Sequence, residues 1–349
     1  MILLDVSFLN EKSTGIHTVI RNIERVFNDN KVKYKTISYY DYFKTKNKIL
    51  WIIYYNIIIN LKLIRLKNND IFFLPANLGG MYFIIKNKAK AFFLIYDIFE
   101  ISECKSKLKK NINKLRFSFL IKKMDKIITI SKDSCLNIKK YFPNAEKKVF
   151  VVYLFVEYQF ENLIDIKKYA IKLANIGHYI LANGSGQERK NIIFLIENMK
   201  SLYQKYGFKL ILIGKDFYKN QYKTVLSSIS ESDCADIIYH FGEVSNEELF
   251  FLYKNAECFV FPSLNEGFGL PPLEALAGGC KILISNIPIF REIFYPMNCF
   301  FDFNSCSLEK AFENMLREDN DQFIFKRKLI LELYSYEKYS SELLKIFAI

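Results

Sequence analysis

The sequence predicts an α/β protein made of two Rossmann-like, doubly wound domains. Its 349 residues are too many for one ordinary domain and suit two. Short apolar runs alternate with longer segments of helical periodicity, and this alternation occurs twice along the chain. Such alternation indicates parallel sheets with helices on both faces. A hydrophobic fraction of 51% supplies two cores and excludes a disordered chain.

The first half of the chain contains five apolar runs that predict strands. They are Ile2–Asp5, Ile71–Leu74, Ala91–Tyr96, Lys126–Thr129 and Val149–Val152, with helices expected between them at Thr18–Phe27 and Cys104–Met124. The second half repeats the scheme. Its expected strands are Tyr179–Asn183, Lys209–Ile213, Ile237–Phe241, Cys258–Phe261 and Lys281–Ser285. Its expected helices are Ile192–Tyr206, Asn246–Asn255, Leu273–Gly278 and Leu308–Arg317.

No linker rich in Pro or Gly marks the join between the two series. We place an N-terminal domain at residues 1–165 and a C-terminal domain at residues 166–330. Residues 331–349 hold a final helix, expected at Ser335–Phe347, that can cross back to the first domain. Ligands of open parallel sheets bind beyond the carboxyl ends of the strands. Two such sheets facing across a cleft would hold a ligand between them, so functional residues should directly follow strands.

Charge is distributed unevenly along the chain. The formal net charge is +13, from 50 Lys and Arg against 37 Asp and Glu. Residues 1–160 hold 29 basic and 13 acidic side chains, a net of +16, whereas residues 161–349 hold 21 and 24, a net of −3. A strongly basic half indicates an anionic partner, and nucleic acid, an anionic membrane or a phosphorylated ligand would each fit.

The cysteines and the first residues indicate a compartment. Seven cysteines at irregular spacing, without a CxxC pair, accompany only three histidines, so reduced thiols and no zinc site are expected. Met1–Leu4 lacks a basic region and is followed by Asp5, so no signal peptide is expected. We therefore expect a cytoplasmic protein.

The most apolar run of the chain, Ile49–Ile59, leaves two alternatives open. Its length of about eleven residues is too short for a bilayer span, which needs roughly 20. One alternative is a buried helix or strand. The other is an interfacial helix that places Trp51, Tyr54 and Tyr55 at the level of lipid headgroups.

The basic stretch Cys104–Lys126 also leaves two alternatives open. It holds nine Lys and Arg, and apolar residues repeat along it at the spacing of one helix face. This amphipathic helix either packs on the core with a solvated face or contacts anionic lipid or a lipid-pyrophosphate acceptor. A nucleic-acid surface would need aromatic side chains regularly interleaved with the charges or a recognition motif, and we find neither pattern. The apolar repeat consists of Leu108, Ile112, Leu115 and Phe119.

The most informative segment is Phe261–Leu276, with the sequence FPSLNEGFGLPPLEAL. It follows an expected strand and opens an expected helix, and its two prolines suit a first helical turn. Gly267 and Gly269 allow the backbone to approach a ligand closely. Free amides at a helix N-terminus bind phosphate, and Glu266 and Glu274 flank that position. The alternative is a structural turn in which both acids only complement the helix dipole.

This segment resembles the E-x7-E motif of the family-4 retaining glycosyltransferases, which have two Rossmann-like domains in the GT-B fold. Other segments resemble landmarks of that family in the same order, and together they span nearly the whole chain. The E-x7-E segment is fairly specific, whereas the glycine loop and the serine signature are weak alone. The landmarks are Thr14–Ile16 as the glycine loop, Ile127–Ser131 as the strand-plus-serine signature, Gln187–Asn191 as the donor-phosphate loop, Phe241–Val244, Ser285–Pro288 and Tyr334–Lys338.

The resemblance implies roles for the matching residues. A leaving nucleoside diphosphate gains charge, which Arg189 and Lys190 would stabilise without an obligatory metal or other cofactor. Glu266 would contact hydroxyls of the donor sugar, and Glu274 would contact those of the ribose. Backbone of both domains would meet the sugar and the diphosphate. The donor-binding residues are Gly15, Ile16, Ser185, Gly267, Phe268, Gly269, Leu270 and Glu274.

Two positions depart from the pattern of the family. Relatives often carry His-Asp after an N-terminal strand, where this chain has Tyr96 and Asp97. A tyrosine can donate a hydrogen bond but does not titrate near neutrality. Relatives often have Gly-Arg where Ser185 stands, and Arg189 can supply that charge from another position. The predicted catalytic residues are Glu266, Arg189, Lys190, Tyr96 and Asp97.

Two other patterns are given structural roles. Asp319–Asp321 has the spacing of a metal-binding Asp-x-Asp triplet but trails a helix, so a surface loop is expected. Ser131 has no base near it in sequence, so it is expected to cap a helix rather than to act as a nucleophile.

The sequence therefore predicts a retaining glycosyltransferase of bacterial surface polysaccharide biosynthesis. It would move a sugar from a nucleotide-sugar, bound by the C-terminal domain, to a glycan or lipid-pyrophosphate-linked acceptor, bound by the basic N-terminal domain. Peripheral contact with anionic membrane at the inner face of the cytoplasmic membrane is expected, and nucleic-acid binding is not. The alternatives are a GT-B nucleotide-sugar epimerase or hydrolase, a non-catalytic glycosyltransferase-like scaffold and, on charge alone, a nucleic-acid-binding protein.

Overall fold

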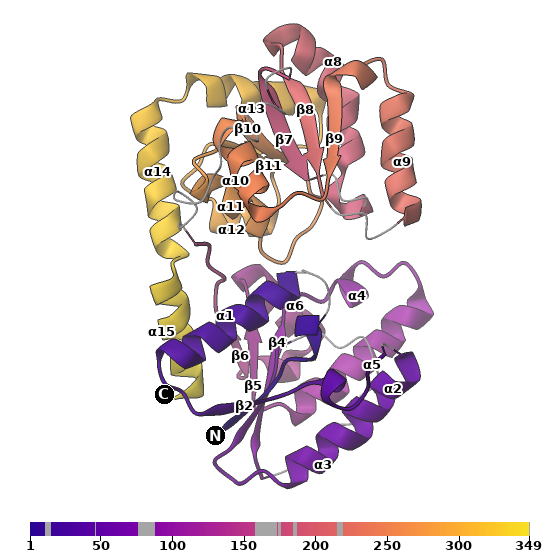
Figure 1. The fold of residues 1–349 in the computed structure, drawn as a ribbon, viewed down its shortest axis with the longest axis vertical. Coiled ribbons are helices and arrows are strands. Elements are labelled where there is room, and N and C mark those ends of the chain that lie inside the picture. Colours follow the sequence, from indigo (N-terminus) through magenta and orange to yellow (C-terminus); the bar gives the residue numbers. More distant parts are fainter. Residues whose placement is uncertain are drawn as a thin grey trace. The chain divides into compact units, whose positions relative to one another are not determined.

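The computed structural model describes residues 1–10, 15–45, 47–75, 88–157, 173, 176–183, 187–214 and 219–348. The chain forms two compact units: unit 1 is Met1–Leu154 with Tyr339–Ile349, and unit 2 is Phe155–Lys338. Within the described ranges, each unit is built on one six-stranded parallel sheet with helices packed on it (Figure 1). The expected pair of doubly wound α/β domains is therefore confirmed.

The sheet of unit 1 has the strand order β2-β1-β3-β4-β5-β6. From β1 the chain first adds β2 on one side and then continues with β3 on the other, so the order reverses between β1 and β3. The five predicted strands are present, each within one residue of its expected ends. The strands are β1 (Ile2–Asp5), β2 (Tyr34–Ile37), β3 (Ile71–Leu74), β4 (Lys90–Ile95), β5 (Lys126–Thr129) and β6 (Val149–Val151).

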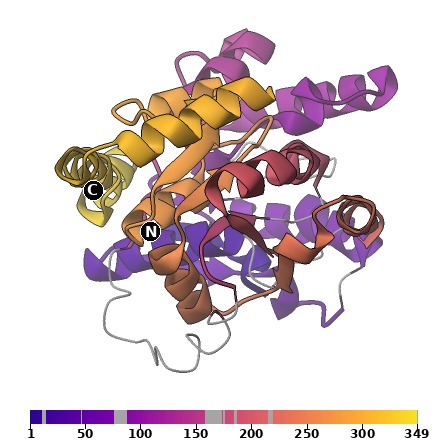
Figure 2. The same ribbon diagram turned by 90° about the horizontal axis from the view of Figure 1, so that it is seen from above.

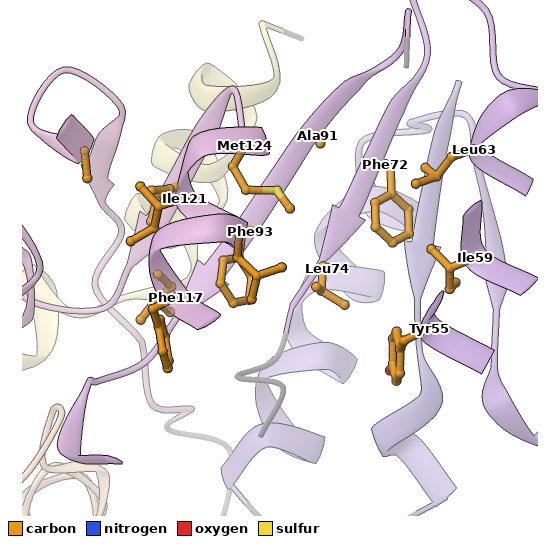
Figure 3. Close-up of a cluster of buried hydrophobic side chains, with 14 of the residues drawn as sticks. Tyr55, Ile59, Leu63, Phe72, Leu74, Ala91, Phe93, Phe117, Ile121 and Met124 are labelled. Carbon is orange, nitrogen blue, oxygen red and sulfur yellow. The ribbon is translucent and has the colours of Figure 1, made fainter. Parts of the chain in front are cut away.

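Two groups of helices cover one face of this sheet and share its core. One group is a continuous helical run of α2 (Lys48–Ile53), the π-helical η3 (Tyr54–Ile58) and α3 (Ile59–Ile64). The other group is the short α4 (Phe99–Ser102) and α5 (Lys107–Lys123). Figure 3 shows Tyr55, Ile59 and Leu63 of the first group and Phe117 and Ile121 of α5 gathered over strands of the same sheet.

In the run Ile49–Ile59 the structure shows a helix that buries its aromatic side on the core. Trp51, Tyr54 and Tyr55 are only 8, 0 and 1% exposed, so the alternative that placed these three residues at lipid headgroups is wrong. The reason is aromatic packing, because the Trp51 ring stacks on Tyr39 with centroids 4.6 Å apart and on Tyr55 at 5.4 Å. Within the part of the chain that is described, no helix is both long and apolar enough to cross a membrane.

The opposite face of the same sheet is covered by α1 (Gly15–Asp29) and by the end of the C-terminal helix α15 (Tyr336–Phe347). The Phe347 ring lies 5.3 Å from Phe27, 5.2 Å from Phe73 and 5.1 Å from Phe92, measured between centroids. These contacts attach the last residues of the chain to unit 1.

Unit 2 has the strand order β12-β11-β10-β7-β8-β9, which reverses between β7 and β10. Helices lie on both sides of its strands (Figures 1 and 2). The strands are β7 (Tyr179–Asn183), β8 (Lys209–Ile213), β9 (Ile238–Gly242), β10 (Cys258–Phe261), β11 (Ile282–Ser285) and β12 (Phe300–Phe301). The helices are α8 (Ile192–Tyr206), α9 (Lys219–Ser230), α10 (Asn246–Asn255), α11 (Leu270–Ala277), α12 (Pro288–Ile293), α13 (Ser305–Arg317) and α14 (Asn320–Leu333).

The division between the units lies between Leu154 and Phe155, whereas the sequence analysis placed it between residues 165 and 166. Phe155 already packs on unit 2, because its ring lies 5.3 Å from that of Tyr336. The amide of Val156 also donates to the Tyr334 carbonyl at 3.4 Å. Helix α15 begins in unit 2, and its residues from Tyr339 onward belong to unit 1.

Candidate active site

The two loops that follow β7 and β10 lie side by side because these strands are neighbours in the parallel sheet. After β7, the short helix η5 (Glu188–Lys190) carries Arg189 and Lys190. Asn191, with φ of 52°, then takes the left-handed conformation that asparagine tolerates and leads into α8. Backbone joins the two loops directly, since the amide of Leu264 donates to the Arg189 carbonyl at 2.8 Å. The segment Gln187–Asn191 is thereby fixed against the loop after β10.

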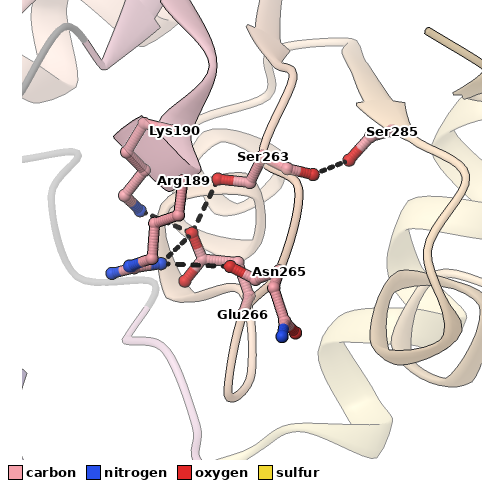
Figure 4. Close-up of polar contacts among 6 residues, drawn as sticks. All are labelled: Arg189, Lys190, Ser263, Asn265, Glu266 and Ser285. Carbon is pink, nitrogen blue, oxygen red and sulfur yellow. Dashed lines mark hydrogen bonds and ion pairs between the residues drawn. The ribbon is translucent and has the colours of Figure 1, made fainter. Parts of the chain in front are cut away.

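The carboxylate of Glu266 is the centre of the site. Its Oε1 atom lies 2.7 Å from Lys190 Nζ, 2.6 Å from Arg189 Nη1 and 2.7 Å from the Ser263 hydroxyl (Figure 4). Ser263 is fully buried and Glu266 is 8% exposed. Two cations, of which Lys190 is 76 residues away in sequence, and a hydroxyl donor therefore converge on one oxygen.

Burial and charge oppose each other in this cluster. Burial by itself raises the pKa of Glu266, but Lys190 and Arg189 outweigh it and hold the pKa below its ordinary value of 4.5. Burial lowers the pKa of Lys190 from 10.5, and Glu266 counteracts that shift. Lys190 Nζ also lies 4.3 Å from the centre of the Phe261 ring, a cation–π contact. The carboxylate stays ionised because the two cations face it.

Two serines that the sequence analysis left without a role support this cluster. Ser263 donates to Glu266, and the hydroxyl of the buried Ser285 donates to the Ser263 carbonyl (Figure 4). Both serines stand at the carboxyl ends of neighbouring strands, β10 and β11. That placement, a small polar residue at the end of a buried strand, is the sequence signal that could have identified them.

The helix that follows, α11, carries the second acid of the motif. Glu274 is half-buried, and burial raises its pKa to about 6, with Lys190 acting in the opposite direction. Lys190 is therefore electrostatically coupled to both acids of the E-x7-E segment. Phe268 is buried against the Tyr334 ring at 5.6 Å, so it supports the loop.

Gly269 explains why the loop requires glycine before α11. Its φ of 114° is a conformation that other L-residues rarely adopt. A Cβ atom built there would lie 2.9 Å from Cε1 of Phe290. The helix begins at the next residue, Leu270, with Pro271 and Pro272 in its first turn as expected.

The predicted site residues of unit 1 lie at the carboxyl ends of its strands. Gly15 and Ile16 open α1, and among the described residues nothing beyond its own helix and chain neighbours comes within 4 Å of a Cβ placed on Gly15. The Tyr96 hydroxyl donates to the Pro75 carbonyl at 2.9 Å, and burial raises its pKa well above 10. Asp97 accepts a hydrogen bond from the Phe99 amide at 3.1 Å. Tyr96 is thus a hydrogen-bonding group that stays protonated at neutral pH.

The remaining predictions concern Ser185, Thr14, Ser131 and the Asp319–Asp321 triplet. Ser185 lies outside the described residues, as does Thr14 of the glycine loop. Ser131 caps α6 (Lys132–Tyr141) by accepting from the Ser134 amide at 3.0 Å, which confirms the capping prediction. The triplet Asp319–Asp321 was expected in a surface loop, but it opens α14: Asp319 caps this helix and Asp321 lies in its first turn. Across the described ranges, no group of three or more His, Cys, Asp or Glu side chains could hold a metal ion.

The two parallel sheets give the chain the two-domain GT-B fold of glycosyltransferases. The solved structure of the sucrose-phosphate synthase from Thermosynechococcus elongatus is similar to this chain. The two superpose with a TM-score of 0.75 at 12% identity, and the match covers 99% of this chain and 98% of the synthase. At that identity the likeness concerns the fold alone. Residues 168–328 match the family model of the glycosyl transferases group 1. Over these residues the C-terminal part of the chain is similar to the group 1 glycosyltransferases.

Two curated relatives resemble part of the chain. The O-antigen chain mannosyltransferase RfbU of Salmonella typhimurium strain LT2 is 31% identical over 186 residues, which are 52% of this chain and 49% of RfbU. The GDP-mannose:cellobiosyl-diphosphopolyprenol alpha-mannosyltransferase of Xanthomonas campestris is 30% identical over 135 residues, 38% of this chain and 35% of the relative. The chain thus spans about half, or less, of the length of the curated relatives that it matches.

Proposed function

We propose that this protein is a retaining glycosyltransferase that transfers a sugar from a nucleotide-sugar to a glycan acceptor in surface polysaccharide biosynthesis. The observation that carries the proposal is the convergence of Arg189 and Lys190 with Glu266 at the carboxyl ends of β7 and β10. That position is the point where the strand order reverses, and ligands of open parallel sheets bind there.

The proposed reaction exchanges one C–O bond for another. The bond between the anomeric carbon and the diphosphate breaks, and its electron pair leaves with the nucleoside diphosphate. A bond forms between that carbon and an acceptor hydroxyl oxygen, whose proton passes to the departing phosphate. Arg189 and Lys190 stabilise the growing negative charge, so no metal is obligatory. Because Glu266 holds both cations in place before the donor arrives, they need little reorganisation when the charge develops.

The names of the relatives favour a particular donor and acceptor. Both relatives are named mannosyltransferases, and one is named for GDP-mannose and a diphosphopolyprenol-linked acceptor. We therefore propose GDP-mannose as the donor and a lipid-pyrophosphate-linked glycan as the acceptor. The protein would act in the cytoplasm, at the inner face of the cytoplasmic membrane where such acceptors are presented.

Donor binding by two variants tests this site. Lys190→Ala and Glu274→Ala should each abolish measurable binding of GDP-mannose in calorimetric titrations while the chain remains folded. Lys200→Ala is the matched control, because Lys200 is an exposed lysine of the same unit, 2.7 Å from an exposed Asp233 carboxylate. Unchanged affinity for GDP and UDP in both site variants would remove the donor-site assignment.

An assay of the reaction distinguishes transfer from its alternatives. Release of GDP from GDP-mannose should depend on membranes that contain the lipid-linked acceptor, and the mannose should appear in the lipid fraction. Equal GDP release without any acceptor would instead indicate a hydrolase or epimerase that shares the donor site. Binding without turnover under both conditions would indicate a non-catalytic relative.

A further inference from the structure

Helix α5 of unit 1 exposes an apolar stripe to solvent. It buries Phe117, Leu120 and Ile121 on the sheet, and the residues that repeat at helical spacing point elsewhere. Of the two alternatives, packing on the core therefore holds for the helix, but the apolar repeat itself lies on the solvated face. Its members, Leu108, Ile112, Leu115 and Phe119, are 71, 44, 57 and 47% exposed.

The helical run α2–η3–α3 exposes a second set of apolar side chains. It packs on the same face of the sheet as α5 (Figure 3), so the outer sides of both form the outside of one helical layer. The aromatic residues of this run point into the core, and aliphatic residues remain outside. Those residues are Ile49, Ile52, Ile57, Leu61 and Ile64, which are 67, 43, 53, 56 and 60% exposed. We call the two sets together the apolar face.

Basic residues accompany the apolar face, and acidic residues are missing from both helical segments. Residues 47–67 and 104–124 contain no Asp or Glu. Beside the stripe of α5, a cavity of about 360 Å³ is lined by Lys114, Lys122 and Tyr141, among others. The exposed lysines on and next to α5 are Lys105, Lys107, Lys109, Lys114, Lys122 and Lys123.

We propose that the apolar face docks on a bilayer surface that contains anionic lipid. Aliphatic and aromatic side chains of a surface helix can insert at the boundary between headgroups and acyl chains, while neighbouring lysines reach the lipid phosphates. Charge selects this occupant over a second copy of the chain. In a two-fold dimer the same patch would face itself, so the lysines of one copy would meet those of the other.

The apolar face belongs to unit 1 and shares no residue with the cation cluster of unit 2. The proposed function already places the protein at the membrane, and the present proposal goes beyond it by naming the surface that binds lipid and the charge of that lipid. A vesicle-binding measurement needs neither donor nor acceptor. Each can hold or fail while the other is unaffected.

Sedimentation with lipid vesicles tests the proposal on the full chain. Wild type should bind vesicles of phosphatidylcholine with one third phosphatidylglycerol and should remain in solution with phosphatidylcholine alone. Leu115→Ser with Phe119→Ser should abolish binding to the anionic vesicles. The combined change of Lys107, Lys109 and Lys114 to Gln should weaken binding about a hundredfold, since each lysine near an anionic surface contributes about fivefold.

A control replaces two apolar side chains of similar fractional exposure in unit 2. Ile324 and Leu333 on α14 are 55 and 49% exposed, and their helix carries both signs of charge. Ile324→Ser with Leu333→Ser should leave vesicle binding unchanged. All replaced side chains are exposed, so an unchanged melting temperature confirms that each variant is folded.

Three results would overturn the proposal. The first is equal sedimentation with neutral and anionic vesicles. The second is full binding by both the serine and the glutamine variants of α5. The third is that the wild type is a dimer in solution and that Leu115→Ser with Phe119→Ser converts it to a monomer without changing vesicle binding. That result would assign the apolar face to contact with a second copy of the chain.

Discussion

Two single variants, Lys190→Met and Arg189→Met, compare the contribution of a buried cation with that of a partly exposed one. The Lys190 side chain is 9% exposed and that of Arg189 is 31% exposed, yet both lie within 2.7 Å of the same Glu266 oxygen. If both act on a diphosphate, both variants should lose affinity for it. Only the variant that removes the buried cation should lose much stability.

The expected magnitudes follow from these contacts. A hydrogen bond between charged groups contributes about 1.5–3 kcal/mol, whereas a buried pair that loses one partner completely costs about 3–5 kcal/mol. Because Arg189 and Ser263 remain on Glu266, we expect Lys190→Met to lower the free energy of unfolding of unit 2 by about 2 kcal/mol. Arg189→Met should cost less than about 1 kcal/mol. Each variant should weaken binding of a nucleoside diphosphate by at least about tenfold, the loss expected for one such contact.

Two assays separate these effects. Denaturant unfolding gives the stability, and the transition of unit 2 is the one that nucleotide shifts, since the two units need not unfold together. Calorimetric titration of GDP gives the affinity, with Lys200→Met as the exposed control. Equal losses of stability in both variants would refute the argument from burial. Unchanged GDP affinity in both would refute the role on the diphosphate.

Three further predictions concern the supporting structure. Burial raises the pKa of Glu274 from 4.5 to about 6, so the folded chain holds this proton more tightly than the unfolded chain, and stability should fall as pH rises between these values. Glu274→Gln should flatten that part of the stability profile of unit 2, and an unchanged slope would contradict the shift. Gly269→Ala should destabilise unit 2 by about 1–3 kcal/mol in denaturant unfolding. The reason is that the new Cβ would stand on a residue with φ of 114° and would lie 2.9 Å from Phe290. An unchanged stability would mean that the loop adapts freely. Ser131→Ala should cost unit 1 about 1 kcal/mol by removing the cap of α6 without affecting GDP binding, whereas loss of binding would give Ser131 a different role.

Buried strands were predictable from sequence because continuous apolar runs identify them. Ile2–Asp5 and Cys258–Phe261 have the predicted bounds and are buried along their whole length. Tyr34–Ile37 was missed because it is an edge strand with exposed side chains in the middle, so it lacks the apolar signal. Phe300–Phe301 is too short to show any periodicity.

Helical periodicity did not reveal which side of α5 faces the core. The stripe from Leu108 to Phe119 has the regular spacing of a buried face, yet the sheet contacts a different set that includes Phe117 and Leu120. The spacing of apolar residues shows only that one side of the helix is apolar. An apolar side can face the protein core or another apolar environment. Only the placement of α5 on its sheet distinguishes the two.

The acids and cations of the candidate site were named from sequence, but their mutual contact was not. Lys190 and Glu266 are 76 residues apart and meet because β7 and β10 are neighbours in the sheet. Strand order depends on how the helices cross between strands, and a single sequence does not state it. The support from Ser263 and Ser285 depends on the same neighbourhood of strand ends.

The central claim is that unit 2 binds a nucleotide-sugar through its diphosphate. The most direct measurement is a thermal-shift panel of GDP, UDP, GDP-mannose and UDP-glucose on the wild-type chain and on Lys190→Ala, because a ligand of the folded state raises the melting temperature. The account predicts that GDP and GDP-mannose raise the melting temperature of the wild type and leave that of Lys190→Ala unchanged. A wild-type melting temperature that none of the four compounds changes, each at millimolar concentration, would contradict it.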